Sequence, residues 1–334
     1  MPPKLGSWVP WAEATGGRAS TLAGFREHLS RYSRSKVVYL CGVLNSLLGT
    51  WEGQENFIEI HAELLRYAFP AEYAEKFVKA SKNPQARRVF FHRQQLLLVA
   101  KEAILHCHEQ GDDPLSLPYW GRLGGAFLMA NDHLQSYRPQ AESEEEKMVR
   151  ILPDLLLAQE YAGHNLLAHR IVRSHLMYTR LPATLTGHPQ YLDLAQMFQK
   201  LTGLALVEFE ALCFGTLSKC MNLKLAAFRA NPGMFLLSGS SFHTTAMPSE
   251  KVELFLKEVS ATAEEFHSSF GRRNTSLVDF TWFRDRPFVR QADTLYPLDP
   301  GFVAEKIETG PFWRAFSSLP DDRSKKGLHA PIRR

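Results

Sequence analysis

The sequence has no long apolar run and no recognisable secretion leader. Across 334 residues, no uncharged apolar stretch approaches the roughly 20 residues that a membrane-spanning helix needs. The first residues, MPPKLGSWVPWAEATGG, lack the apolar centre of a signal peptide. We therefore expect no membrane contact and a cytoplasmic location.

Cysteine is scarce, with four residues in the chain, and none forms a Cys-x-x-Cys pair. Cys213 and Cys220 are the closest in sequence, and on a predicted helix their Cα atoms would lie about 10.5 Å apart. That separation is too long for a disulfide. Cys41 and Cys107 are isolated, so we expect free thiols in a reducing compartment.

The motifs of the common catalytic classes are absent. There is no Gly-x-Ser-x-Gly nucleophile turn, no glycine-rich phosphate loop and no His-Glu-x-x-His metal motif. His106 and His108 would lie on opposite faces of a helix and could not share a metal. The only Glu-x-Lys triplet, Glu145–Lys147, falls in an acidic helix start, whereas a metal-dependent nuclease needs it in a strand. We predict no catalytic residue, no metal site and no cofactor.

Basic charge is in small excess and sits mostly at one end. The net charge is +4, and residues 320–334 hold five Lys or Arg against two Asp, which accounts for +3 of it. The rest of the chain is nearly neutral, whereas a nucleic-acid-binding protein usually has a stronger basic excess on its folded part. We expect residues 319–334 to form a flexible basic tail.

Most of the chain carries helical periodicity. Val37–Trp51 is apolar nearly all round and predicts a core helix, and Phe57–Ala68 follows the i, i+3, i+4 spacing. Met247-Pro248 opens a helical run that reaches Phe266. The predicted fold is mainly α, a multi-helix, bundle-like body with a small C-terminal β-hairpin followed by a short helix. Its parts are an extended N-terminal arm (1–20), the helical body (21–275), a hairpin-plus-helix unit packed on the body (276–318) and the tail (319–334).

The pattern changes after Gly271. Leu277–Phe283 is rich in β-forming residues. Phe288–Arg290 and Leu295–Leu298 are strand-like and are joined by four residues, which predicts a hairpin. Asp299-Pro300-Gly301 predicts a turn into a short helix that ends near Gly310-Pro311. A step from strand to helix normally leads into another folded unit, so we interpret this segment as a coupling element.

Two groups of basic residues suggest an alternative function. Arg87, Arg88 and Arg93 crowd one predicted helix start, and Arg170, Arg173 and Arg180 lie along another helix. A stripe of this kind could contact nucleic-acid phosphates. Solvated arginines that cover the core with their stems are the more common arrangement. Nucleic-acid binding therefore stays open as an alternative.

Four segments together resemble a group of bacterial proteins. They are RLGGAFLMANDHL (Arg122–Leu134), LTGLALVEFEALCFG (Leu201–Gly215), MPSEKVELFLKEVSATAEEF (Met247–Phe266) and FRDRPFVRQADTLYPLDPGFVAEKIETGPFW (Phe283–Trp313). In that group a long helical region commonly precedes a restriction-endonuclease-like domain, and such architectures occur among anti-phage and mobile-element proteins. The nuclease core has no counterpart in this sequence, so the resemblance transfers no catalytic residue.

We expect a non-catalytic helical scaffold or sensor subunit that binds a partner protein in a bacterial, defence-type complex. The resemblance implies that the partner could be an effector nuclease. Aromatic residues of the C-terminal segment are the candidate anchors, because such residues carry most of the binding energy at interfaces. They are Phe288, Tyr296, Phe302, Phe312 and Trp313, which could instead pack the hairpin against the helices. An enzyme whose pocket is assembled from scattered residues is a further alternative.

Overall fold

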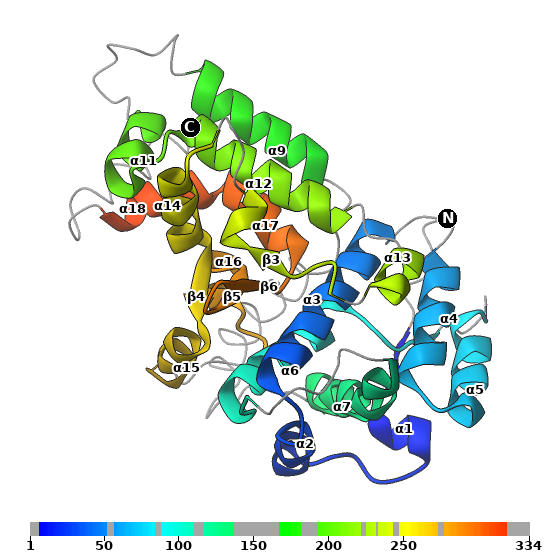
Figure 1. The fold of residues 1–334 in the computed structure, drawn as a ribbon. Helices are drawn as coiled ribbons and strands as arrows, with labels where there is room; N and C mark the ends of the chain where they lie inside the picture. Colours follow the sequence, from blue (N-terminus) through cyan, green and yellow to red (C-terminus); the bar gives the residue numbers. More distant parts are fainter. Residues whose placement is uncertain are drawn as a thin grey trace, which may run out of the picture.

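The protein is described by a computed structural model that covers ten stretches of the chain. These are residues 7–51, 57–83, 88–109, 117–136, 167–181, 193–221, 225–231, 233–242, 247–272 and 277–318. The predicted tail (319–334) and Arg87 lie outside the described residues. The prediction of a mainly helical fold is confirmed (Figure 1).

The first half of the chain supplies seven helices among the described residues. They are α1 (Trp11–Thr15), α2 (Leu22–Leu29), α3 (Arg34–Trp51), α4 (Phe57–Ala68), α5 (Ala71–Ser81), α6 (Arg93–His106) and α7 (Leu117–Ser136). Two short strands, β1 (Ser7–Trp8) and β2 (Arg88–Val89), pair in parallel. The predicted core helix at residues 37–51 is α3, and its buried face includes Val38 and Leu44.

The second half alternates short helices with strands. Its helical elements are α9 (Leu167–His175), the π-helical turn η1 (Leu176–Arg180), α11 (Leu194–Thr202), α12 (Leu206–Met221), α13 (Leu225–Ala230), the 3-10 turn η2 (Gly239–Phe242), α14 (Ser249–Val259), α15 (Ala263–Arg272), α16 (Thr281–Asp285), α17 (Pro300–Glu308) and α18 (Gly310–Ser318). Its strands are β3 (Leu237–Ser238), β4 (Ser260–Thr262), β5 (Phe288–Gln291) and β6 (Thr294–Pro297).

The predicted hairpin forms the centre of a four-stranded sheet. β5 and β6 pair antiparallel around a tight turn in which Ala292 takes a positive φ of 51°. The strand order is β3-β6-β5-β4, with β3 antiparallel to β6 and β4 parallel to β5. The two outer strands were not predicted.

The sheet lies between two hydrophobic cores, and alternate residues face opposite cores. The larger core gathers α2 to α7 with α13, α15 and α16, and the second core gathers α9, α11, α12 and α14 (Figure 1). On β5, Phe288 belongs to the second core and Val289 to the larger one. On β6, Leu295 faces the second core and Tyr296 packs against the larger one. Successive side chains of a strand point to opposite faces, so both faces of this small sheet are covered.

The secondary structure differs from what the sequence pattern indicates in two segments. The helical run from Met247 breaks after Val259, where Ser260–Thr262 forms β4, and α15 restarts with a capping box in which Thr262 N–H donates to Glu265 Oε2 at 2.7 Å. Residues 277–283 form no strand and contain the start of α16 instead. Phe280 and Phe283 are fully buried there, so packing into the larger core outweighs their β-propensity.

The Asp-Pro-Gly turn builds a central helix. Asp299 caps α17 by accepting a hydrogen bond from Gly301 N–H at 2.6 Å, and Pro300 occupies the first turn. Phe302 enters the larger core, whereas Val303 and Ile307 enter the second. α17 is therefore the helix through which the two cores are joined next to the sheet.

The predicted N-terminal arm is held against α7 over its described part. Asp132 accepts hydrogen bonds from Ala12 N–H at 3.4 Å and from Ser20 N–H at 2.7 Å. Asn131 Nδ2 donates to Val9 O at 2.9 Å. Residues 7–20 thus follow the C-terminal half of α7 and include the short helix α1, so the arm is not extended throughout as predicted.

Candidate functional site

The five aromatic residues predicted as partner anchors occupy different environments. Phe288 and Phe302 are fully buried in the two cores and leave no surface for a partner to contact. Tyr296 is half-buried and meets Tyr39 edge-on, with ring centroids 6.3 Å apart. Phe312 is half-buried, and Trp313 is 52% exposed. Trp313 is therefore the most exposed of the five.

Trp313 belongs to a cluster of three rings on α18. The ring centroids of Phe312 and Trp313 lie 5.2 Å apart, those of Trp313 and Phe316 lie 5.7 Å apart, and those of Phe312 and Phe316 lie 5.9 Å apart. α18 packs against α11, so this ring cluster lies on the side of the second core. It presents an aromatic group at the surface but is confined to a single helix.

The arginines predicted to bind nucleic acid do not form one surface in the described residues. Arg93 has only 10% of its side chain exposed, pairs with Asp299 and lies over the ring of Phe302 with 4.8 Å between the guanidinium carbon and the ring centroid. Arg88 pairs with Glu13. Both Arg93 and Arg88 thus hold the fold together, which contradicts their assignment to a free basic face. Arg87 and the side chain of Arg170 lie outside the described residues.

The remaining two arginines lie in an exposed stripe on α9 and η1. Arg173 and Arg180 are exposed, and so are four apolar side chains between and beside them. We call these six residues the α9 stripe: Val172, Arg173, Leu176, Met177, Arg180 and Leu181. Val172 is 58% exposed, and the other three apolar members are 47–50% exposed. Four of the six members of the stripe are therefore apolar and two are cationic.

Exposed large apolar side chains lie mainly on the helices around the second core. Besides the α9 stripe and Trp313, α12 exposes Val207 and Phe214, at 58% and 45%. Among the described residues, the larger core's helices expose only Tyr73 in this class, with Met234 exposed in the segment just after α13. Contiguous exposed apolar surface is typical of protein-binding regions, whereas single residues are ordinary.

Polar contacts hold α9 and η1 on the second core. His175 Nδ1 lies 2.8 Å from Oε2 of the buried Glu210 of α12. Tyr178 O–H donates to the carbonyl of Glu308 in α17 at 2.7 Å, and burial raises the pKa of Tyr178 to about 12. Arg173 Nη2 lies 3.8 Å from Glu308 Oε1. His175 and Tyr178 thus tie α9 and η1 to α12 and α17, and Arg173 adds a longer contact from the exposed side. Turns of π-helix such as η1 are frequent at functional sites.

The four cysteines are free and buried, and burial raises the pKa of the Cys107 thiol to about 12. In the part of the chain that the structure describes, no group of three His, Cys, Asp or Glu side chains could hold a metal ion. No single described helix is both long and apolar enough to cross a membrane, and α11 and α12 pass that test only as a pair bent by 77°.

Comparison with family models, with curated proteins and with solved structures found no match to this chain. The candidate site therefore rests on the geometry alone. The sequence contained a signal for it, since Val172, Leu176 and Leu181 recur at near-helical spacing beside the predicted arginines. Apolar periodicity does not show which helix face meets the core, and here Ile171 and Ser174 are the buried positions.

Proposed function

We propose that the protein is a non-catalytic helical scaffold that binds a partner protein through the α9 stripe. The single observation that supports this proposal is the exposure of four large apolar side chains on α9, η1 and the residue after it, a segment that His175 and Tyr178 hold on the second core. Burying one Leu or Met side chain contributes about 1.5–3 kcal/mol to association. Several such residues on a rigid helix lose little conformational entropy on binding.

The charges beside the apolar residues define the partner's chemistry. Arg173 is 68% exposed at its side chain, and Arg180 is also exposed. A matching partner surface has an apolar centre, into which Leu176 and Met177 insert, and acidic residues at its rim. Rim charges of this kind mainly increase association rates and select the partner. An effector nuclease, suggested by the sequence resemblance, is the first partner to test.

Paired substitutions test the proposal. The double variant Leu176→Glu, Met177→Glu places two charges in the centre of the α9 stripe, and Tyr73→Glu places one on an exposed apolar position of α5. Tagged wild-type protein is purified from its host, a co-purifying protein is identified and produced, and its Kd is measured for each variant. We expect the double variant to weaken binding by at least about 100-fold and Tyr73→Glu to leave it unchanged.

Equal binding by all three proteins would contradict the proposal, as would a wild-type chain that retains no protein. The variant Trp313→Ala distinguishes binding through the α9 stripe from binding through the ring cluster of α18. A loss of binding in Trp313→Ala alone would assign the contact to the ring cluster of α18 instead. If the wild type self-associates and the double variant does not, the α9 stripe binds a second copy of this chain and the proposed partner is wrong.

A further inference from the structure

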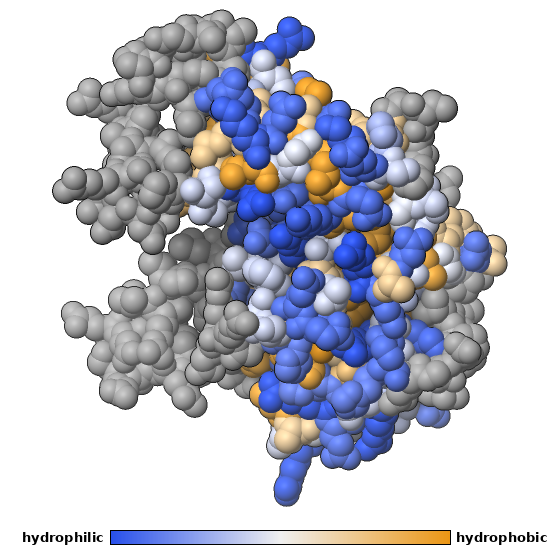
Figure 2. All heavy atoms as spheres, turned by 60° about the vertical axis from the view of Figure 1, so that its left-hand side comes forward, coloured by the Kyte–Doolittle hydropathy of each residue, from blue (hydrophilic) through white to orange (hydrophobic). Residues whose placement is uncertain are grey.

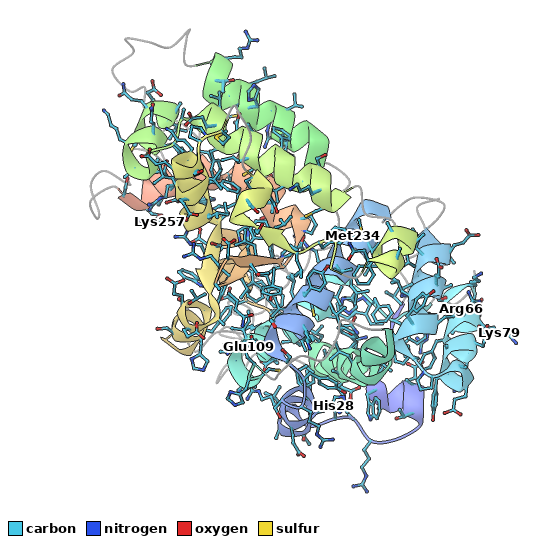
Figure 3. The ribbon with its side chains drawn as sticks, in the orientation of Figure 1. His28, Arg66, Lys79, Glu109, Met234 and Lys257 are labelled. Carbon is cyan, nitrogen blue, oxygen red and sulfur yellow. The ribbon has the colours of Figure 1, made fainter. Side chains whose placement is uncertain are left out.

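A polar groove lies beside strand β4, at the edge of the sheet opposite to β3. It has a volume of about 550 Å³, which is within the range of small-molecule sites. One wall is α15, which contributes Glu264, Glu265, Ser268 and Ser269. The other lining residues are Trp282, Arg286, Arg290 and Lys257, together with Ser260 and Ala261 of β4. Figure 3 labels Lys257 at this edge of the molecule.

The acidic side chains of the groove are already engaged by the protein. Glu265 Oε2 accepts a hydrogen bond from Thr262 N–H at 2.7 Å as part of the capping box. Glu264 Oε1 lies 3.4 Å from Arg34 Nη1, and hydrogen bonds at the start of α15 together with this contact hold the pKa of Glu264 below its usual range. Both carboxylates are thus committed to the start of α15, where negative charge also stabilises the helix.

The basic side chains of the groove form no ion pair among the described residues. Among the residues that the structure describes, neither Lys257 nor Arg290 lies within 4 Å of a carboxylate. Arg286 donates one guanidinium N–H to the carbonyl of Lys257, and this hydrogen bond ties the end of α16 to α14. The other guanidinium N–H groups of Arg286 can then donate to a ligand. Three cations from α14, β5 and the segment after α16 therefore converge on one groove with their charges uncompensated by described ion pairs.

The groove adjoins a smaller hollow that extends the same site. This hollow has a volume of about 170 Å³ and shares Glu264 and Arg290 with the groove. Its lining includes Glu109, which Figure 3 labels nearer the centre of the molecule. The side of the molecule turned forward in Figure 2, which carries α14, β4 and α15 in Figure 1, is predominantly hydrophilic. A ligand of this site is accordingly polar and charged.

We propose that the β4 groove binds the phosphate group of a small phosphorylated molecule. Arg290 and Arg286 supply planar N–H donors that match a phosphate, and Lys257 supplies a third positive charge. Ser268 and Ser269 add hydroxyl groups, and the half-buried Trp282 provides an apolar ring against which the rest of the ligand packs. This inference is independent of the proposed partner contact, because α9 lines neither hollow.

Calorimetric titration tests the groove with defined probes. Inorganic pyrophosphate reports on the phosphate contacts alone, AMP adds an aromatic ring to a phosphate, and adenosine lacks the phosphate. We expect saturable binding of pyrophosphate and AMP with a Kd below about 1 mM, and none of adenosine. Arg290→Gln is expected to weaken both phosphate probes by at least about tenfold, because it removes a charge-assisted hydrogen bond.

Two further variants keep the test decisive if Arg290→Gln affects folding. Lys257→Gln alters an exposed side chain of the groove. Arg31→Gln removes another exposed cation, on the segment just after α2 and far from Lys257 in the chain. Loss of binding in Lys257→Gln but not in Arg31→Gln supports the site. Absence of saturable binding by the wild type, or equal weakening by both glutamine variants, would overturn it. Binding of adenosine as tight as AMP would show that no phosphate is recognised.

Discussion

Gly42 of α3 lies directly against the carbonyl group of Pro297 at the end of β6. A Cβ atom at position 42 would overlap the Pro297 oxygen, so the helix approaches the strand at backbone distance. Just under one turn further along, Asn45 Nδ2 donates a hydrogen bond to Leu298 O at 2.9 Å. These contacts place α3 on the sheet, and they explain why a glycine stands in the middle of an otherwise apolar helix.

We predict that Gly42→Ala destabilises the fold by about 1–3 kcal/mol or more, because the added methyl group forces helix and strand apart. Gly215, on the exposed side of α12, is the matched control, since a Cβ atom added there would meet no neighbouring atom within 4 Å. Gly215→Ala should instead gain up to about 1 kcal/mol from helix propensity. Urea unfolding measures both changes, and similar effects at the two positions would contradict the close approach.

The hairpin and the Asp-Pro-Gly turn were predictable because their signals are local. Phe288–Gln291 and Thr294–Pro297 carry β-forming residues on either side of a tight turn, and Asp299 is a strong helix cap. β4 was not predictable, because a three-residue strand exists only through its pairing with Phe288–Arg290. Residues 277–283 show the same limit, since buried contacts of Phe280 and Phe283 decide their conformation.

The candidate site was predictable only in part. The sequence identifies Arg173 and Arg180 as members of a stripe, but it does not show that Arg93 turns inward to Asp299. It also does not distinguish Phe302, which is buried, from Trp313, which is exposed. In each case the outcome depends on which helix covers the residue, and that is a property of tertiary packing rather than of composition.

The pair formed by Arg93 and Asp299 should be strongly coupled. Asp299 is fully buried, and a second carboxylate, that of Glu305, lies farther from the Arg93 guanidinium, at 3.8 Å. Asp299→Asn preserves a cap for α17 but removes the charge, so the Arg93 guanidinium stays buried with weaker compensation. We predict a loss of about 3 kcal/mol in the free energy of unfolding, measured by chemical denaturation.

A second substitution and a control separate the effect of the Arg93 charge from the effect of the helix cap. Arg93→Met in the Asp299→Asn background removes the poorly compensated cation, so part of the lost stability should return. Asp193 caps α11 in the same way, accepting from Gln196 N–H at 2.9 Å, but has no ion pair among the described residues. Asp193→Asn should change stability by less than about 0.5 kcal/mol. A double variant no more stable than Asp299→Asn would argue against coupling.

His92 should make the fold sensitive to acid. Its Nδ1 accepts a hydrogen bond from Gln95 N–H at 3.4 Å, Nε2 lies 2.8 Å from Asn131 Oδ1, and Trp8 stacks on the ring at 3.8 Å. Burial lowers the pKa of His92 to about 3, so the unfolded chain takes up a proton first. The neutral ring's contribution is complete above pH 6.5 and falls as the pH drops from 6.5 toward 3.

His92→Asn tests this acid sensitivity, because asparagine can cap α6 but does not titrate. The difference in unfolding free energy between wild type and variant should shrink by on the order of 1.4 kcal/mol for each pH unit in that window. His108, which is exposed, supplies the control substitution His108→Asn. A difference that stays constant from about pH 6.5 to about pH 4 would show that the buried imidazole accepts its proton in the folded state.

Lys101 should give a pH dependence of the same sign in the alkaline range. Its side chain is buried beneath Phe270 and Phe280, with Nζ 5.1 Å from the Phe270 ring centroid, and donates to Asp279 O at 3.2 Å. Burial lowers the pKa of Lys101 from 10.5 to about 8. Below pH 8 both states hold the proton and the cost of the buried charge is constant. Between pH 8 and 10.5 only the unfolded chain still holds it, so this contribution to stability rises with pH.

Lys101→Met keeps the unbranched side chain out to the position of Cε and removes the titrating ammonium group. The unfolding free energy of the variant minus that of the wild type should therefore decrease from pH 8 to 10.5, by about 1.4 kcal/mol for each pKa unit of the shift. Lys79→Met, at an exposed position of α5, should show no such trend. Taking the difference cancels the titration of tyrosines and cysteines that both proteins share. A flat difference for Lys101→Met across this window would mean that the buried ammonium keeps its ordinary proton affinity, and that the surrounding rings and carbonyls compensate its charge in full.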